Sequence, residues 1–144
     1  MKPYSILIVD DHLDSAQLVK EDIQNLYPDL FAITIMNDEQ IKKDILTVQY
    51  DLYILDIEMP AISGFDVAKI LHNRQEEALI VFLTTHQELC IDGYEYRAFQ
   101  FLVKENYQNF LKRTMDAVLE ELRKRTTYIE VKNEAFVPVR ILVN

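Results

Sequence analysis

Short apolar runs alternate with amphipathic stretches along most of the chain. The runs predict five strands, at Ser5–Val9, Phe31–Met36, Asp51–Leu55, Leu79–Leu83 and Phe99–Val103. Continuous apolar runs, as opposed to alternating ones, are typical of strands in a parallel sheet that is covered on both faces. We therefore expect a central parallel sheet with helices packed on either side.

The stretches that follow these runs carry apolar residues at helical spacing. They predict five helices, over Leu13–Tyr27, from a cap at Asn37 or Asp38 to about Val48, over Phe65–Asn73, about Glu88–Tyr96 and Asn106–Arg125. The first helix has its apolar stripe at Leu13, Ala16, Val19, Ile23 and Leu26, and the last at Phe110, Leu111, Met115, Val118 and Leu122. Strands and helices in alternation predict a doubly wound α/β fold, which binds ligands beyond the carboxyl ends of its strands.

The last part of the chain has a different pattern. Residues 126–144 contain two apolar stretches separated by Lys132-Asn133-Glu134, which predict two strands in a hairpin. An isolated hairpin is marginal in water, so this one needs a partner. We therefore divide the chain into a main domain over 1–122, a linker over 123–127 and a partial β segment over 128–144.

Composition excludes several classes of site. The 144 residues include two glycines and one cysteine, Cys90, too few for a nucleotide-cradling glycine loop, a disulfide framework or a cysteine-rich zinc site. No apolar run reaches the roughly 18 residues of a membrane span, and the N-terminus lacks a signal-peptide pattern, so a cytoplasmic protein is expected. The net charge of −9 argues against non-specific nucleic-acid binding by the chain as a whole.

Polar residues that could carry chemistry follow directly after four of the predicted strands. They are Asp10 and Asp11, Asp56, Thr84 and Lys104. Because the strands are parallel, these side chains should meet at one edge of the sheet. Clustered carboxylates commonly bind Mg²⁺, and a carboxylate beside such a metal can attack a phosphoryl group, whose oxygens a hydroxyl and a lysine would help to neutralise. The set predicts a phosphoryl acceptor.

Simpler interpretations exist for single members of this set. The Asp10-Asp11 pair alone could cap a helix, and Lys104 alone could be a surface charge. Thr85 is a rival for the role of Thr84. His12, beside the acidic pair, is explained most simply by the polarity of a helix start. Cys90 lies on an apolar stripe and is expected to be a small buried hydrophobe.

Four motifs together resemble a response-regulator receiver domain. They are ILIVDDH at 6–12, YILDIEMPAISGFD at 53–66, VFLTTH at 81–86 and FQFLVK at 99–104. The resemblance spans about residues 3–122 and implies a flavodoxin-like five-stranded sheet of order 2-1-3-4-5 with five helices.

The resemblance also implies a role for each site residue. Asp56 would accept the phosphoryl group from a sensor histidine kinase. The Mg²⁺ ion would be held by Asp10, Asp11, Asp56 and the main chain of Glu58. Thr84, Phe101 and Lys104 would bind the phosphoryl group or relay the switch to the surface of helix 4, strand 5 and helix 5, leading to homodimerisation. Such a domain is not an enzyme beyond its own phosphoryl transfer and dephosphorylation.

Two positions depart from the family pattern. The switch aromatic is Phe101 where tyrosine is common, so a hydroxyl bond is lost while packing remains. Glu105 follows Lys104 where the family has a proline in a cis peptide. A cis bond before a non-proline residue costs several kcal/mol, so this peptide is expected to be trans, which leaves the placement of Lys104 open.

The segment at 126–144 is similar to the opening strands of a LytTR-type DNA-binding domain. This similarity implies a truncated transcriptional regulator that contacts DNA through a domain mostly absent from the chain. Two alternatives remain: a pseudo-receiver that acts as a constitutive interaction module, supported by Glu105 alone, and an aspartyl-phosphate hydrolase, whose expected acid pattern does not fit Asp10, Asp11 and His12.

Overall fold

The computed structural model describes residues 2–75, 77–90 and 94–135, with the backbone alone for residues 94 and 127–135. Five strands form one parallel sheet of order β2-β1-β3-β4-β5. The strands are β1 (Tyr4–Val9), β2 (Phe31–Met36), β3 (Leu52–Asp56), β4 (Ile80–Thr84) and β5 (Gln100–Val103). The α-helices are α1 (Leu13–Leu26), α2 (Asp38–Asp44), α3 (Gly64–Arg74) and α5 (Gln108–Ala135). The predicted flavodoxin-like fold is confirmed.

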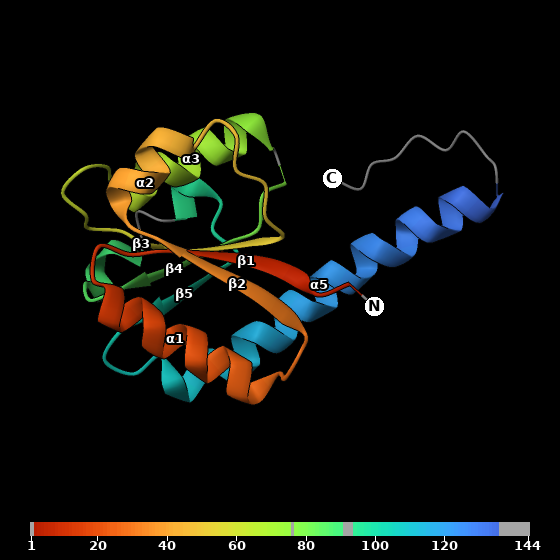
Figure 1. Cartoon of the computed structure of the whole chain (residues 1–144), viewed down its shortest axis with the longest axis horizontal. Coiled ribbons are helices and arrows are strands. Elements are labelled where there is room, and N and C mark those ends of the chain that lie inside the picture. Colours follow the sequence, from red (N-terminus) through yellow and green to blue (C-terminus); the bar gives the residue numbers. More distant parts are fainter. Residues whose placement is uncertain (1, 76, 91–93, 136–144) are drawn as a thin grey trace.

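The sheet separates two apolar cores. Ile6 and Ile8 face the core that α1 and α5 cover, whereas Leu7 and Val9 face the core that α2 and α3 cover. Figure 1 shows the two pairs of helices on opposite faces of the sheet. This arrangement explains the continuous apolar runs, because both faces of each central strand are buried.

Some predicted stripe positions lie outside the cores. Ala16, Val19 and Ile23 of α1 are buried as expected, but Leu13 is 58% exposed and Leu26 is 42% exposed. On α5, Phe110 is 38% exposed and lies under the guanidinium of Arg113, 5.3 Å from the ring centre. These three residues lie in the end turns of their helices, where the partner surface covers them incompletely.

The predicted helix over Glu88–Tyr96 is not a single α-helix in the described residues. Two 3₁₀ turns, η1 (Gln87–Leu89) and η2 (Tyr94–Tyr96), lie on either side of Cys90, which is α-helical, and of residues 91–93, which lie outside the described part. The segment contains Asp92 and Gly93, two poor helix formers, so its intrinsic tendency to form a long helix is low.

The expected linker and the start of the expected β segment are wrong in their secondary structure. Helix α5 continues through 123–127 and up to Ala135, and Figure 1 shows it extending past the edge of the sheet. Extending an existing helix requires no new nucleus, whereas a lone hairpin would need a partner strand, and the described residues offer none at this end of α5. The remainder of the predicted hairpin, residues 136–144, lies outside the described residues.

Candidate functional site

The predicted site residues meet at the carboxyl edge of the sheet. Asp10 and Asp11 directly follow β1, Asp56 ends β3, and Lys104 directly follows β5. Strand β1 lies between β2 and β3, so the chain order reverses beside it. This is the point at which open α/β sheets have a crevice beyond their strand ends.

The ammonium group of Lys104 lies close to two of the carboxylates, those of Asp10 and Asp56. Its Nζ lies 2.9 Å from Asp10 Oδ2 and 3.7 Å from Asp56 Oδ2, and its side chain is 14% exposed. The described residues contain no cis peptide, so the Lys104–Glu105 bond is trans as expected. The Lys104 N–H donates to the Thr84 carbonyl at 2.7 Å, which holds the lysine beside the end of β4. Glu105 in place of proline therefore leaves the lysine within reach of the carboxylates.

Asp56 and Asp10 are buried carboxylates. Asp56 is 6% exposed, and its Oδ1 accepts the N–H of Ile57 at 2.9 Å. Asp10 is 1% exposed, and its Oδ1 accepts the N–H of His12 at 2.9 Å. Burial of Asp56 and the nearby charge of Asp10 raise the pKa of Asp56 to about 7, with Lys104 acting in the opposite direction.

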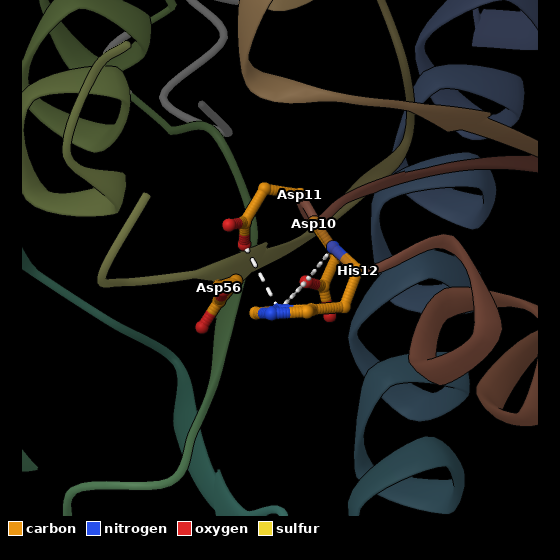
Figure 2. A group of neighbouring side chains, drawn as sticks. All are labelled: Asp10, Asp11, His12 and Asp56. Carbon is orange, nitrogen blue, oxygen red and sulfur yellow. Dashed lines mark hydrogen bonds and ion pairs between the residues drawn. The ribbon is translucent and has the colours of Figure 1, made fainter. Parts of the chain in front are cut away.

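The carboxylates fit a divalent cation. One ligand atom from each of Asp10, Asp11, His12 and Asp56 lies within 4.8 Å of the others, and Figure 2 shows these side chains gathered at the strand ends. Asp11 Oδ1 is buried and accepts no hydrogen bond from the described residues. Three carboxylates face the single ammonium of Lys104, so a divalent ion would balance their charge. Oxygen ligands of this kind suit Mg²⁺.

Thr84 lies on β4, the strand next to the one that ends at Asp56, and Phe101 lies on β5, one strand further along the sheet. The Thr84 side chain is 1% exposed, while its rival Thr85 is exposed. The Thr84 Oγ1 accepts the N–H of His86 at 3.0 Å. Phe101 stacks on Phe82, with ring centres 5.4 Å apart. Thr84 thus ends β4 and Phe101 lies within β5, and their switch roles remain predictions.

Glu58 and His86 form a polar bridge at the rim. The Glu58 side chain is 57% exposed, and its Oε2 lies 3.1 Å from His86 Nε2. The other ring nitrogen of His86 lies 3.0 Å from Glu88 Oε1. The carboxylate of Glu58 thus contacts His86, outside the acidic cluster, and only its main chain was predicted to serve the site.

Gly64 is a site residue that sequence reasoning missed. A Cβ atom at this position would lie 2.0 Å from the carbonyl oxygen of Asp56. The Gly64 N–H donates to the Ile57 carbonyl at 2.8 Å, and the Ser63 hydroxyl caps the helix by accepting the Phe65 N–H at 3.0 Å. The start of α3 therefore packs directly on the backbone of Asp56. The signal available in the sequence was a glycine following a helix-capping serine.

The sequence predicted Asn37 or Asp38 as the cap of α2, and the structure has Asn37 in that role, which leaves Asp38 free for a contact that was not predicted. The Asn37 side chain accepts the Gln40 N–H, and Asp38 lies in the first turn of α2. Asp38 is 6% exposed, and its Oδ2 accepts the Ala61 N–H at 2.7 Å. It ties α2 to the loop between β3 and α3, which carries Glu58. No local sequence signal joins residues that are so far apart.

Cys90 is partly exposed, so the expected full burial is not observed. No α-helix in the part of the chain that the structure describes is both long and apolar enough to cross a membrane.

The chain matches the response regulator receiver domain family over residues 6–116. It belongs to that family. Among curated relatives, the receiver domain is 31% identical over 120 residues to the transcriptional regulatory protein YdfI of Bacillus subtilis, covering 79% of this chain and 54% of that protein. It is 29% identical over 133 residues to the transcriptional regulatory protein BtsR of Salmonella typhi, covering 90% of this chain and 54% of that protein.

A solved structure of the same fold carries a bound ion. The response regulator protein TrrA of Thermotoga maritima, in complex with Mg²⁺ and beryllium fluoride, is 33% identical to the receiver domain, with a TM-score of 0.69. The similarity covers 80% of this chain and 98% of TrrA. By contrast, the chain spans about half the length of the YdfI and BtsR proteins.

Proposed function

We propose that Asp56 accepts a phosphoryl group from a sensor histidine kinase in a reaction that depends on Mg²⁺. A carboxylate oxygen of Asp56 forms a bond to phosphorus as the bond from phosphorus to the donor's imidazole nitrogen breaks, leaving an acyl phosphate and a free imidazole. The convergence of Asp10, Asp11, Asp56 and Lys104 at one sheet edge carries the proposal. The Mg²⁺-containing complex of TrrA supports it.

The neighbouring residues have separate roles in this proposal. Asp10, Asp11, Asp56 and the main-chain carbonyl of Glu58 would hold Mg²⁺, which neutralises phosphoryl oxygens when bound. Lys104, now paired with Asp10, would donate to a phosphoryl oxygen and so stabilise the charge that develops on it. The buried hydroxyl of Thr84, whose oxygen accepts the N–H of His86, would donate its O–H to a phosphoryl oxygen.

The signal would leave the site through β4 and β5. Movement of Thr84 toward the phosphoryl group would free space beside Phe101, which stacks on Phe82. A change in Phe101 would then alter the surface formed by η1, η2, β5 and α5 and favour a homodimer. In the described residues this surface corresponds to the helix 4, strand 5 and helix 5 face expected from the sequence, with η1 and η2 on either side of residues 90–93.

The output is proposed to be transcriptional. YdfI and BtsR are transcriptional regulatory proteins, and about half of each lies outside its match to this chain. We infer from this that an output domain lies outside the chain; a LytTR type was expected from the pattern of residues 126–144, of which residues 126–135 are helical in the structure. The reading frame beyond codon 144 tests this directly. A frame that encodes a basic, β-rich domain supports the proposal, and a stop codon contradicts it.

Incubation with a small phosphodonor and Mg²⁺ tests the acceptor role. Intact-mass spectrometry should detect one added phosphoryl group on the wild type, none on Asp56→Asn and none when Mg²⁺ is chelated. Asp66→Asn is a matched control, because Asp66 is an exposed carboxylate in the first turn of α3. Equal labelling of Asp56→Asn and the wild type would contradict the proposal. Absence of labelling in every variant, with a donor that labels TrrA, would favour a pseudo-receiver.

A further inference from the structure

His12 is placed as a helix cap but does not act as one. It is the N-terminal cap residue of α1, yet its side chain makes no capping hydrogen bond. The ring is turned instead toward the acidic cluster, with Nδ1 3.2 Å from Asp11 Oδ1 and 3.6 Å from Asp10 Oδ1 (Figure 2). The polarity of a helix start, which explained His12 from sequence, does not account for this orientation.

The backbone of His12 is held at the site. Its N–H donates to Asp10 Oδ1 at 2.9 Å, so the residue that carries the imidazole is bonded to one of the buried carboxylates. The His12 side chain is 70% exposed, so the ring stands at the mouth of the cluster and is open to an ion arriving from solvent. The position is therefore both fixed in its backbone and accessible.

The distances suit a shared ion. Two ligands of one octahedral ion, each about 2.1 Å from it, lie about 3.0 Å apart when adjacent and about 4.2 Å apart when opposite. The two Nδ1 distances of 3.2 and 3.6 Å lie in this range. Asp11 Oδ1, which accepts no hydrogen bond from the described residues, is the nearer of the two oxygens. A cation between His12 and Asp11 would satisfy that oxygen.

We propose that His12 is an additional ligand of this metal site and favours transition-metal ions such as Co²⁺ or Zn²⁺. The inference rests on the proposed metal site and extends it from an all-oxygen set to oxygen plus nitrogen. Imidazole suits Zn²⁺, Co²⁺ and Ni²⁺, whereas Mg²⁺ prefers oxygen ligands. The acceptor site would thus discriminate among divalent ions through a residue that the phosphoryl chemistry itself does not use.

Calorimetric titration of the metal-free protein with Co²⁺ and with Mg²⁺ separates the two claims. His12→Gln should weaken Co²⁺ binding at least tenfold, since even the loss of an outer-sphere partner of a metal ligand costs about 10- to 100-fold in affinity. The same variant should change Mg²⁺ affinity by less than about threefold. The d–d absorption bands of bound Co²⁺ should shift in His12→Gln because a nitrogen ligand is replaced.

Two further variants serve as controls. His86→Gln removes another partly exposed histidine at the same edge of the sheet, 3.1 Å from Glu58, and should leave Co²⁺ binding unchanged. Asp11→Asn should weaken the binding of both ions. In the wild type, Mg²⁺ should compete with Co²⁺ for binding.

The possible negative results distinguish the role of His12 from the existence of the metal site. An unchanged ratio of Co²⁺ to Mg²⁺ affinity in His12→Gln, or a loss of Co²⁺ binding in His86→Gln, overturns the role of His12. A wild type that binds neither ion overturns the metal site itself. Because the His12 side chain makes no capping hydrogen bond, His12→Gln should fold, and thermal unfolding of that variant in chelator checks this.

Discussion

The ammonium group of Lys104 lies 2.9 Å from the Asp10 carboxylate, and through this contact the end of β5 is joined to the end of β1. The same ammonium lies 3.7 Å from Asp56 on the strand between β1 and β4. One ammonium therefore opposes two buried carboxylates, and with the third carboxylate, that of Asp11, a charge of −2 remains for a divalent ion to neutralise. Lys104 is thus a counter-ion of both carboxylates, and in the proposed reaction it would bind a phosphoryl oxygen.

Replacing Lys104 with methionine should slow phosphoryl acceptance by about 100-fold, because a preorganised donor to the transferring group is lost. The measurement is the rate of labelling by a small phosphodonor at saturating Mg²⁺. Lys112→Met is the control, since Lys112 also lies 2.9 Å from an aspartate, Asp116, but on the exposed surface of α5. Labelling of Lys104→Met at close to the wild-type rate would contradict the role given to Lys104.

The raised pKa of Asp56 predicts a dependence of stability on pH. Its pKa is raised from 3.8 to about 7, first by burial and then by the charge of Asp10. An acid whose pKa is higher in the folded state destabilises the fold as the pH rises above its unfolded value, because the unfolded chain ionises first. Without metal, the free energy of unfolding should therefore fall relative to Asp56→Asn as the pH rises from about 4 to about 7.

The size of this effect follows from the shift in pKa. At about 1.4 kcal/mol per unit, the gain in stability of Asp56→Asn should approach at most about 4 kcal/mol above pH 7 and vanish near pH 4. Urea unfolding in chelator at several pH values measures it. A difference between the two proteins that stays constant across this range would show that Asp56 ionises normally.

Gly64→Ala tests the contact between α3 and the acceptor strand. The added Cβ would meet the Asp56 carbonyl at 2.0 Å, so the start of α3 or the end of β3 must move. We expect a loss of about 1–3 kcal/mol in the free energy of unfolding, together with slower labelling of Asp56. Lys69→Ala, on the exposed side of the same helix, should change stability by less than about 0.5 kcal/mol. Equal stabilities for the two variants would count against this contact.

Much of the fold follows from local patterns. Strand β2 has the bounds that its apolar run predicted, and the other strands differ by one residue at one or both ends. The acidic cluster could also be anticipated, because parallel strands bring their carboxyl ends to one edge. Gly64 and Asp38 were missed for the same physical reason: each serves the site through a contact with a distant backbone group, which no spacing along the chain encodes.

The last turns of α5 show that an apolar pattern alone cannot distinguish a strand from a helix. The β-branched and aromatic residues Tyr128, Ile129 and Val131 favour a strand by propensity, yet the structure continues α5 through them. A strand gains its stability from a neighbour, whereas a helix gains it from the preceding turn. Whether this segment forms a strand or a helix therefore depends on its neighbours, which the pattern does not reveal.

Asp38→Ala tests the anchor of the loop between β3 and α3. The N–H of Ala61 would lose its acceptor at 2.7 Å, and an unpaired buried donor costs about 1–3 kcal/mol. Glu39→Ala, in the same turn of α2 but exposed, is the matched control. The free energy of unfolding measured by chemical denaturation should be about 1–3 kcal/mol lower for Asp38→Ala than for the control. Coincident unfolding curves would show that the loop does not depend on this bond.

The most direct test of the account locates the phosphoryl group itself. After reaction with a small phosphodonor and Mg²⁺, borohydride reduction converts an aspartyl phosphate to homoserine, which peptide mass spectrometry can assign to a position. Homoserine is expected at residue 56 in the wild type, and none when Mg²⁺ is chelated. Homoserine at another aspartate, or modification at residue 56 that does not require a divalent ion, would contradict it.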